Sequence, residues 1–106
     1  MLGDVKDAAL ALALKAYLND RLSAYGEITL CRVNTRNKHV TLSALLDGEK
    51  ETLTATLEGF DLERGPRGVF AIPRKFNSSR PWLTRLLNAL FAGKRYALPA
   101  ALASLL

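Results

Sequence analysis

Cysteine and histidine are almost absent from this chain of 106 residues, which contains one of each, Cys31 and His39. A single cysteine excludes an internal disulfide, and zinc needs more Cys or His ligands than the chain supplies. The sequence also has no phosphate-binding loop, no dinucleotide fingerprint and no nucleophile elbow. We therefore expect a protein without metal or cofactor and without catalytic function.

Long apolar runs are missing as well. The longest uncharged run near the start, residues 8–14, is far shorter than the roughly 20 residues that span a bilayer. Asp4 and Asp7 stand where a secretory signal carries positive charge. We expect a soluble, cytoplasmic protein, whose contact with a membrane would be peripheral. At 49% apolar residues the chain can build the core of a single domain, residues 1–106.

Acidic residues are confined to one part of the sequence. Residues 1–63 hold all ten acids and seven basic residues, for a net charge of −3, whereas residues 64–106 are acid-free and carry +8. Such a split indicates that one end of the fold faces an anionic partner. The alternative is that the two halves pair electrostatically, within one chain or between chains. The basic residues of the second half are Arg64, Arg67, Arg74, Lys75, Arg80, Arg85, Lys94 and Arg95.

Residues 4–25 are typical of an amphipathic helix. Ala and Leu dominate and favour helix, the Asp4 carboxylate is placed to cap the first turn, and Gly26 ends the helix. Apolar residues recur at helical spacing and define the face that should meet the core. They are Leu10, Leu14, Tyr17, Leu18, Leu22 and Tyr25.

Four strands are predicted next, because the apolar period changes from 3.6 to 2. A phase shift between Leu30 and Cys31 predicts a bulge in the first strand. The residues ERGPRG make a turn before the fourth strand, and Pro73 places that strand at a sheet edge, since proline cannot donate to a ladder. The predicted strands are residues 27–34, 39–46, 49–57 and 69–76.

The turn Asp47-Gly48 predicts a two-residue type I′ hairpin, in which both residues have positive φ. This turn pairs Leu42 with Leu53, puts the apolar residues on one face and leaves a threonine-rich face for water. His39 falls on the polar face. We expect Cys31 to be a buried structural thiol; a thiol–imidazole pair with His39 across the first hairpin is the alternative.

A second helix should begin near Ser78 or Ser79, one of which would cap it, with Pro81 in the first turn. Gly93 ends this helix, and Pro99 starts a last short helix. The predicted fold is therefore α+β with two layers. It consists of an N-terminal helix, a four-stranded antiparallel meander, a C-terminal helix and a short terminal helix.

The stretch RKFNSSRPWLTRLL, residues 74–87, joins basic, aromatic and serine residues without any acid. A helix N-terminus adds free N–H groups and a positive dipole end, so this stretch predicts an anion-binding site. An ordinary helix start, with Trp82 in the core and the basic groups in solvent, is the alternative. The predicted anion-binding residues are Arg74, Lys75, Ser79 and Arg80, and the predicted apolar contacts are Trp82, Leu86 and Leu90.

The leading hypothesis is a non-enzymatic binding module whose basic, apolar C-terminal half engages an anionic lipid or membrane surface. A nucleic-acid-binding protein is the first alternative, with Phe76, Trp82 or Tyr96 stacking on bases. The second is a homo-oligomeric interaction or structural protein, in which the acidic half of one copy meets the basic half of another. An enzyme remains a fourth reading, although no residue stands out as catalytic.

Overall fold

The computed structural model describes the backbone of residues 2–106 and the side chains of residues 5–106. The predicted first helix is present as α1, Leu2–Leu22. The proposed cap by Asp4 lies outside the described side chains. The helix ends before Tyr25, whose N–H donates to the Leu22 carbonyl (2.9 Å). Because of this turn, Tyr25 is not part of the apolar face of α1, and the Tyr25 side chain is exposed.

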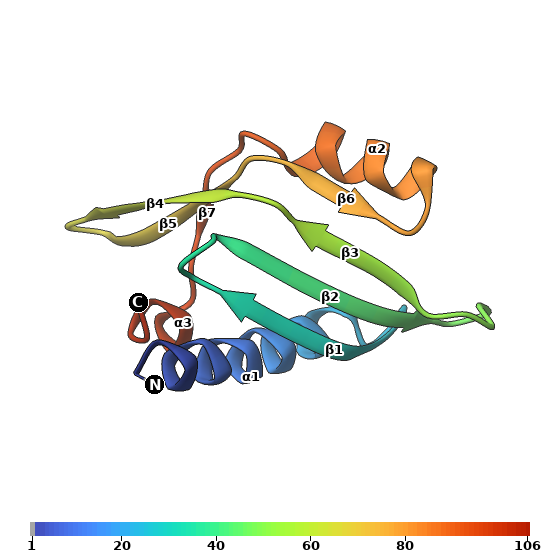
Figure 1. Cartoon of the computed structure of the whole chain (residues 1–106), viewed down its shortest axis with the longest axis horizontal. Coiled ribbons are helices and arrows are strands. Elements are labelled where there is room, and N and C mark those ends of the chain that lie inside the picture. The colour runs from blue at the N-terminus through green and yellow to red at the C-terminus, as the bar shows by residue number, and fades with distance from the viewer. Residues whose placement is uncertain (1) are drawn as a thin grey trace.

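Seven strands follow α1, in two antiparallel sheets (Figure 1). Sheet A has the order β1-β2-β3-β6, and sheet B has the order β4-β5-β7. The elements after α1 are β1 (Gly26–Asn34), β2 (His39–Leu46), β3 (Leu53–Leu57), β4 (Phe60–Gly65), β5 (Gly68–Pro73), β6 (Phe76–Ser78), α2 (Pro81–Phe91), β7 (Tyr96–Ala97) and α3 (Ala100–Ala103).

The two sheets share one long, bent hairpin. β3 continues into β4, β5 continues into β6, and the pairing register is the same on both sides of the bend. At the bend, the Glu58 N–H donates to the Lys75 carbonyl and the Arg74 N–H donates to the Gly59 carbonyl, both at 2.7 Å. The predicted four-stranded antiparallel meander is therefore confirmed as sheet A. Beyond the bend, the hairpin of β3 and β6 continues as β4 and β5. These two strands and β7 form sheet B.

The connection between β2 and β3 is longer than the predicted two-residue turn. A type I′ turn needs positive φ at two successive residues, but in this turn only Gly48 has one (87°). Leu42 consequently pairs with Ala55, not with Leu53, and residues 47–52 form a loop. The register differs from the predicted one by two residues. Because side chains alternate with period two, the predicted faces of these strands are unchanged.

The predicted bulge in β1 exists, but it lies earlier, between Ile28 and Leu30. The predicted edge position of Pro73 is wrong, because β5 is the central strand of sheet B. β7 pairs only with Phe70 and Ala71, so the ladder on that side does not reach Pro73 at the strand end. A central strand therefore accommodates proline where no N–H is required.

The core is small. α1 packs on β1 and α3, whereas α2 packs on β6, so the two long helices cover opposite edges of sheet A (Figure 1). The chain exposes 7111 Å². A compact monomer of 11.6 kDa exposes roughly 5,800 Å², so this fold leaves more surface open than its mass requires. The apolar side chains buried among residues 5–106 are Leu10, Ile28, Leu53, Pro73 and Leu102.

Candidate binding surface

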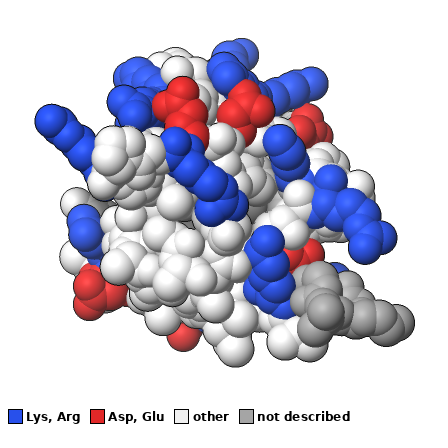
Figure 2. Space-filling view, turned by 90° about the vertical axis from the view of Figure 1, so that its left-hand side faces the viewer, with Lys and Arg blue, Asp and Glu red and all other residues white. Residues whose placement is uncertain are grey.

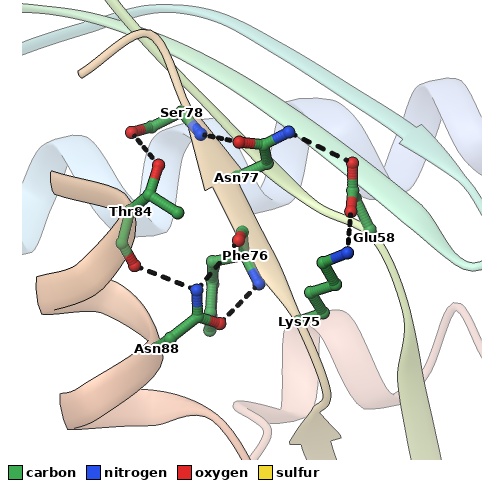
Figure 3. A network of polar contacts seen from close by, with 7 residues as sticks. All are labelled: Glu58, Lys75, Phe76, Asn77, Ser78, Thr84 and Asn88. Carbon is green, nitrogen blue, oxygen red and sulfur yellow. Dashed lines mark hydrogen bonds and ion pairs between the residues drawn. The ribbon is translucent and has the colours of Figure 1, made fainter. Parts of the chain in front are cut away.

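α2 turns two of its polar side chains, Thr84 and Asn88, toward sheet A. Asn88 Oδ1 accepts a hydrogen bond from the Phe76 N–H (2.8 Å), and Asn88 Nδ2 donates to the Phe76 carbonyl (3.0 Å). One turn earlier, the hydroxyls of Thr84 and Ser78 lie 2.7 Å apart (Figure 3). β6 is an edge strand of sheet A, so Asn88 satisfies backbone groups of a strand that has no further neighbour, and Thr84 bonds a side chain of the same strand.

The apolar side of α2 faces outward as a consequence. Trp82, Leu86 and Leu90 are 51%, 45% and 46% exposed, and their i, i+4 spacing aligns them along the helix. We call these three residues the α2 ridge. Phe91 packs edge-on against Phe76, with ring centroids 6.3 Å apart, and holds the other apolar side of α2 on the sheet. Trp82 thus lies on the surface and is not a core residue.

The predicted anion-binding residues Arg74 and Lys75 already have acidic partners in the chain. The Arg74 guanidinium pairs with Asp61, and Lys75 Nζ lies 3.7 Å from Glu58 Oε2. Figure 3 shows Lys75 and Glu58 on the side of β6 away from α2. Lys75 and the ridge therefore lie on different faces of sheet A.

Ser79 and Arg80 stand at the start of α2, but neither serine caps the helix. The N-cap is Arg80, without a side-chain cap. Ser78 Oγ donates to the Arg80 carbonyl (2.7 Å), and Ser79 Oγ accepts from the Thr54 N–H of β3 (3.1 Å). The serines therefore connect the start of α2 to the sheet. The Arg80 guanidinium lies 3.3 Å from Glu51, in the loop before β3.

The acidic and basic halves of the sequence pair within this chain. Besides the three pairs above, Arg95 Nε lies 2.8 Å from Glu63 Oε1. The alternative of pairing within one chain is therefore confirmed for four basic residues of the second half. The other four basic residues of that half have no ion pair with an acid of residues 5–106: they are Arg64, Arg67, Arg85 and Lys94.

Arg85 and Lys94 were not predicted as site residues. Arg85 lies on the exposed side of α2, next in sequence to Leu86, and Lys94 follows the helix end, where Gly93 has a φ of 79°. A helical projection places Arg85 beside the ridge, so the sequence contained this signal. The acidic partners of the other basic residues come from distant segments, and sequence spacing could not reveal them.

The thiol and the imidazole lie on opposite faces of sheet A. Cys31 pairs with Leu42 of β2, and His39 is three residues from Leu42 on the same strand. Side chains three residues apart on a strand point to opposite faces, so the thiol–imidazole alternative is wrong. Burial raises the pKa of the Cys31 thiol to about 11, against a smaller opposing effect of Lys15. The thiol is therefore protonated and unreactive near neutral pH.

No three metal-ligating side chains gather anywhere in the described part of the chain. Within residues 2–106, no helix is both long enough and apolar enough to cross a membrane. The chain matches no protein-family model, no curated protein and no solved structure.

Proposed function

We propose that this protein is a non-catalytic binding module whose α2 ridge contacts the surface of an anionic lipid membrane. The observation that carries the proposal is the orientation of α2, which directs Asn88 and Thr84 to the sheet and the ridge outward. A helix with Trp and Leu on its outer face suits the boundary between headgroups and acyl chains. Basic residues beside such a face are attracted to anionic headgroups.

The charges around the ridge favour an anionic partner over a second copy of this chain. A symmetric dimer places the same patch of both copies face to face. Arg85 and Lys94 of one copy would then lie near the basic residues around the ridge of the other, and the acid that an ion pair places beside the start of the ridge, Glu51, is already engaged by Arg80. An anionic surface meets the same residues with opposite charge.

The extent of exposed surface leaves room for such a partner. The accessible area exceeds that of a compact monomer by more than the roughly 800 Å² that each partner buries in a standard interface. The ridge supplies three of the large apolar side chains that are exposed.

The predicted anion-binding residues divide into two groups under this proposal. Arg80 stands directly before the ridge, and the Ser79 hydroxyl beside it keeps its proton available for donation to a phosphate oxygen. The Arg80–Glu51 pair is exposed, and exposed pairs contribute no more than about 1 kcal/mol, so a lipid phosphate can replace the carboxylate. Lys75 lies on the other face of sheet A and has no part in this contact.

Vesicle binding tests the proposal. The chain's single Trp, Trp82, reports directly on the ridge, and its fluorescence should shift to the blue with vesicles containing phosphatidylglycerol. We expect weak binding to purely neutral vesicles and a decline with added salt. Equal binding to neutral vesicles, or an unchanged Trp82 spectrum, would contradict the proposal. Steeply salt-dependent binding to single-stranded RNA, without vesicle binding, would favour the nucleic-acid alternative.

A matched pair of variants locates the contact. The double change Leu86→Ser and Leu90→Ser makes the ridge polar and should weaken vesicle partition about tenfold or more, since each buried leucine contributes roughly 1.5–3 kcal/mol. Leu12→Ser changes an exposed leucine of α1 in the same way and should leave partition unchanged. An equal loss in both variants would remove the ridge as the contact surface. Sedimentation of the free protein as a dimer would favour the homo-oligomer.

A further inference from the structure

A cavity of about 450 Å³ lies between the start of α1, the turn from β1 to β2, and β4. None of its lining residues belongs to α2, so it is separate from the ridge. The cavity lies toward the end of the molecule shown in Figure 2, where Lys and Arg side chains are more abundant than acidic ones. Its size falls within the range of roughly 300–1,000 Å³ that is typical of small-molecule sites.

Basic side chains from three segments meet at this cavity: Lys6 from α1, Arg36 and Lys38 from the turn, and Arg64 from β4. Lys38 Nζ lies 3.9 Å from Asp61. Lys6, Arg36 and Arg64 form no ion pair with an acid of residues 5–106. Within residues 5–106, these three side chains therefore have no acidic partner that would compete with an anion.

One acid, Asp7, also lines the cavity, but its oxygens are occupied. Asp7 Oδ1 accepts from the Thr35 hydroxyl (2.7 Å), and Asp7 Oδ2 accepts from the Thr35 N–H (3.3 Å). These bonds join the turn to α1 and so keep Arg36 and Lys6 at the same cavity. The carboxylate thus has a structural partner, and the cavity keeps a net positive charge.

Part of the wall is apolar, beside the polar Asn34. Phe60 and Leu62 of β4 and Leu106 contribute half-buried side chains. A bare inorganic ion would leave this wall in contact with water, whereas a ligand with a short apolar body would cover it. Arg36 and Arg64 offer planar guanidinium groups that match a phosphate or carboxylate.

We propose that this cavity binds a single anionic amphiphile, with a phosphate or carboxylate head on Arg36, Arg64 and Lys6 and an apolar body against Phe60 and Leu62. The site needs no membrane surface, so it goes beyond the proposed function of the ridge.

Calorimetric titration with decyl phosphate, below its micelle-forming concentration and without vesicles, tests the site. We expect saturable binding of one molecule per chain, and no saturable binding of inorganic phosphate over the same concentration range. Arg64→Glu should weaken decyl phosphate binding about tenfold or more, because it reverses a charge in contact with the head. Arg67→Glu, in the turn of the same hairpin but outside the cavity, should change it less than about twofold.

Three results would overturn the inference. They are no binding of decyl phosphate, equally tight binding of inorganic phosphate, and an equal loss in the Arg64→Glu and Arg67→Glu variants. The last result would mean that the ligand is attracted to the basic surface in general.

The variant with Leu86→Ser and Leu90→Ser should bind decyl phosphate like the wild type. A failure of the ridge proposal would therefore leave this result unaffected, and a failure of the cavity would leave ridge-dependent vesicle binding intact.

Discussion

The side-chain amide of Asn88 takes the place of a neighbouring strand for Phe76, since it accepts from the N–H and donates to the carbonyl of that one residue. At the opposite edge of sheet A, Asn19 of α1 does the same for Ile28, at 2.7 and 3.1 Å. Each helix therefore closes one edge of the sheet with an asparagine. For α2 this requires the polar side to face inward, which is why the ridge faces outward.

Replacing Asn88 with alanine should destabilise the fold by about 1–3 kcal/mol, because two hydrogen bonds are lost and the Phe76 backbone groups are left without protein partners. Urea unfolding measures this change in the free energy of unfolding. Asn77→Ala is the matched control: Asn77 is exposed on β6, and its amide bonds only Glu58, at 3.5 Å, and the N–H of the next residue, Ser78, at 3.0 Å. The control should stay within about 0.5 kcal/mol. Equal effects of the two changes would refute the role assigned to Asn88.

Gly26→Ala should be more damaging than Gly48→Ala. A Cβ at Gly26 would lie 2.4 Å from the Leu45 carbonyl oxygen, a backbone atom that cannot move aside, whereas a Cβ at Gly48 meets nothing within 4 Å. Gly48 has a φ of 87°, so alanine there should cost about 1 kcal/mol from backbone strain alone. We expect at least twice that loss at Gly26 in thermal or urea unfolding. Equal losses would show that β1 and β2 separate easily at this point.

Sequence patterns predicted the elements whose signals are local. The predictions were wrong where contacts between distant segments determine the structure. Periodicity placed β2 at its observed bounds, and Pro81 and Gly93 marked the ends of α2. The Asp47-Gly48 pattern gave the wrong register, because only Gly48 adopts positive φ and the loop is longer.

In the candidate site, too, local features were predictable from the sequence and contacts between distant segments were not. Helical spacing predicted the alignment of the ridge residues but not their exposure. The exposure arises because Asn88 bonds the backbone of the edge strand β6, which orients α2 with the ridge outward. The partners of Arg74 and Lys75, which are Asp61 and Glu58, come from across the long hairpin. Only the three-dimensional pairing could show that these predicted anion ligands are already engaged.

Cys31 should make stability depend on pH in the alkaline range. Burial raises the pKa of its thiol from 9.0 to about 11. Below pH 9 the thiol is protonated in both the folded and the unfolded chain, so its contribution is fully present. Between pH 9 and about 11 the unfolded chain loses this proton while the folded chain keeps it, and the free energy of unfolding falls.

Cys31→Ala isolates that contribution. The free energy of unfolding of the variant should fall less steeply between pH 9 and 11 than that of the wild type. The wild-type thiol should also react slowly with a disulfide reagent at pH 8 until the protein is unfolded. Fast reaction of the folded protein would show that the thiol is neither buried nor protonated.

Glu51→Gln should strengthen binding to anionic vesicles, because it releases Arg80 directly before the ridge. A basic residue near an anionic surface contributes about 1 kcal/mol, so the gain should reach up to about fivefold in partition.

Glu58→Gln is the matched control, since it makes the same change in net charge but releases Lys75 on the side of β6 away from α2. We expect the control to gain clearly less. Both changes should alter stability by no more than about 1 kcal/mol, because Glu51 and Lys75 are exposed and Glu58 is only half-buried. Equal gains would mean that net charge alone governs binding and that the α2 side of the molecule is not the contact surface.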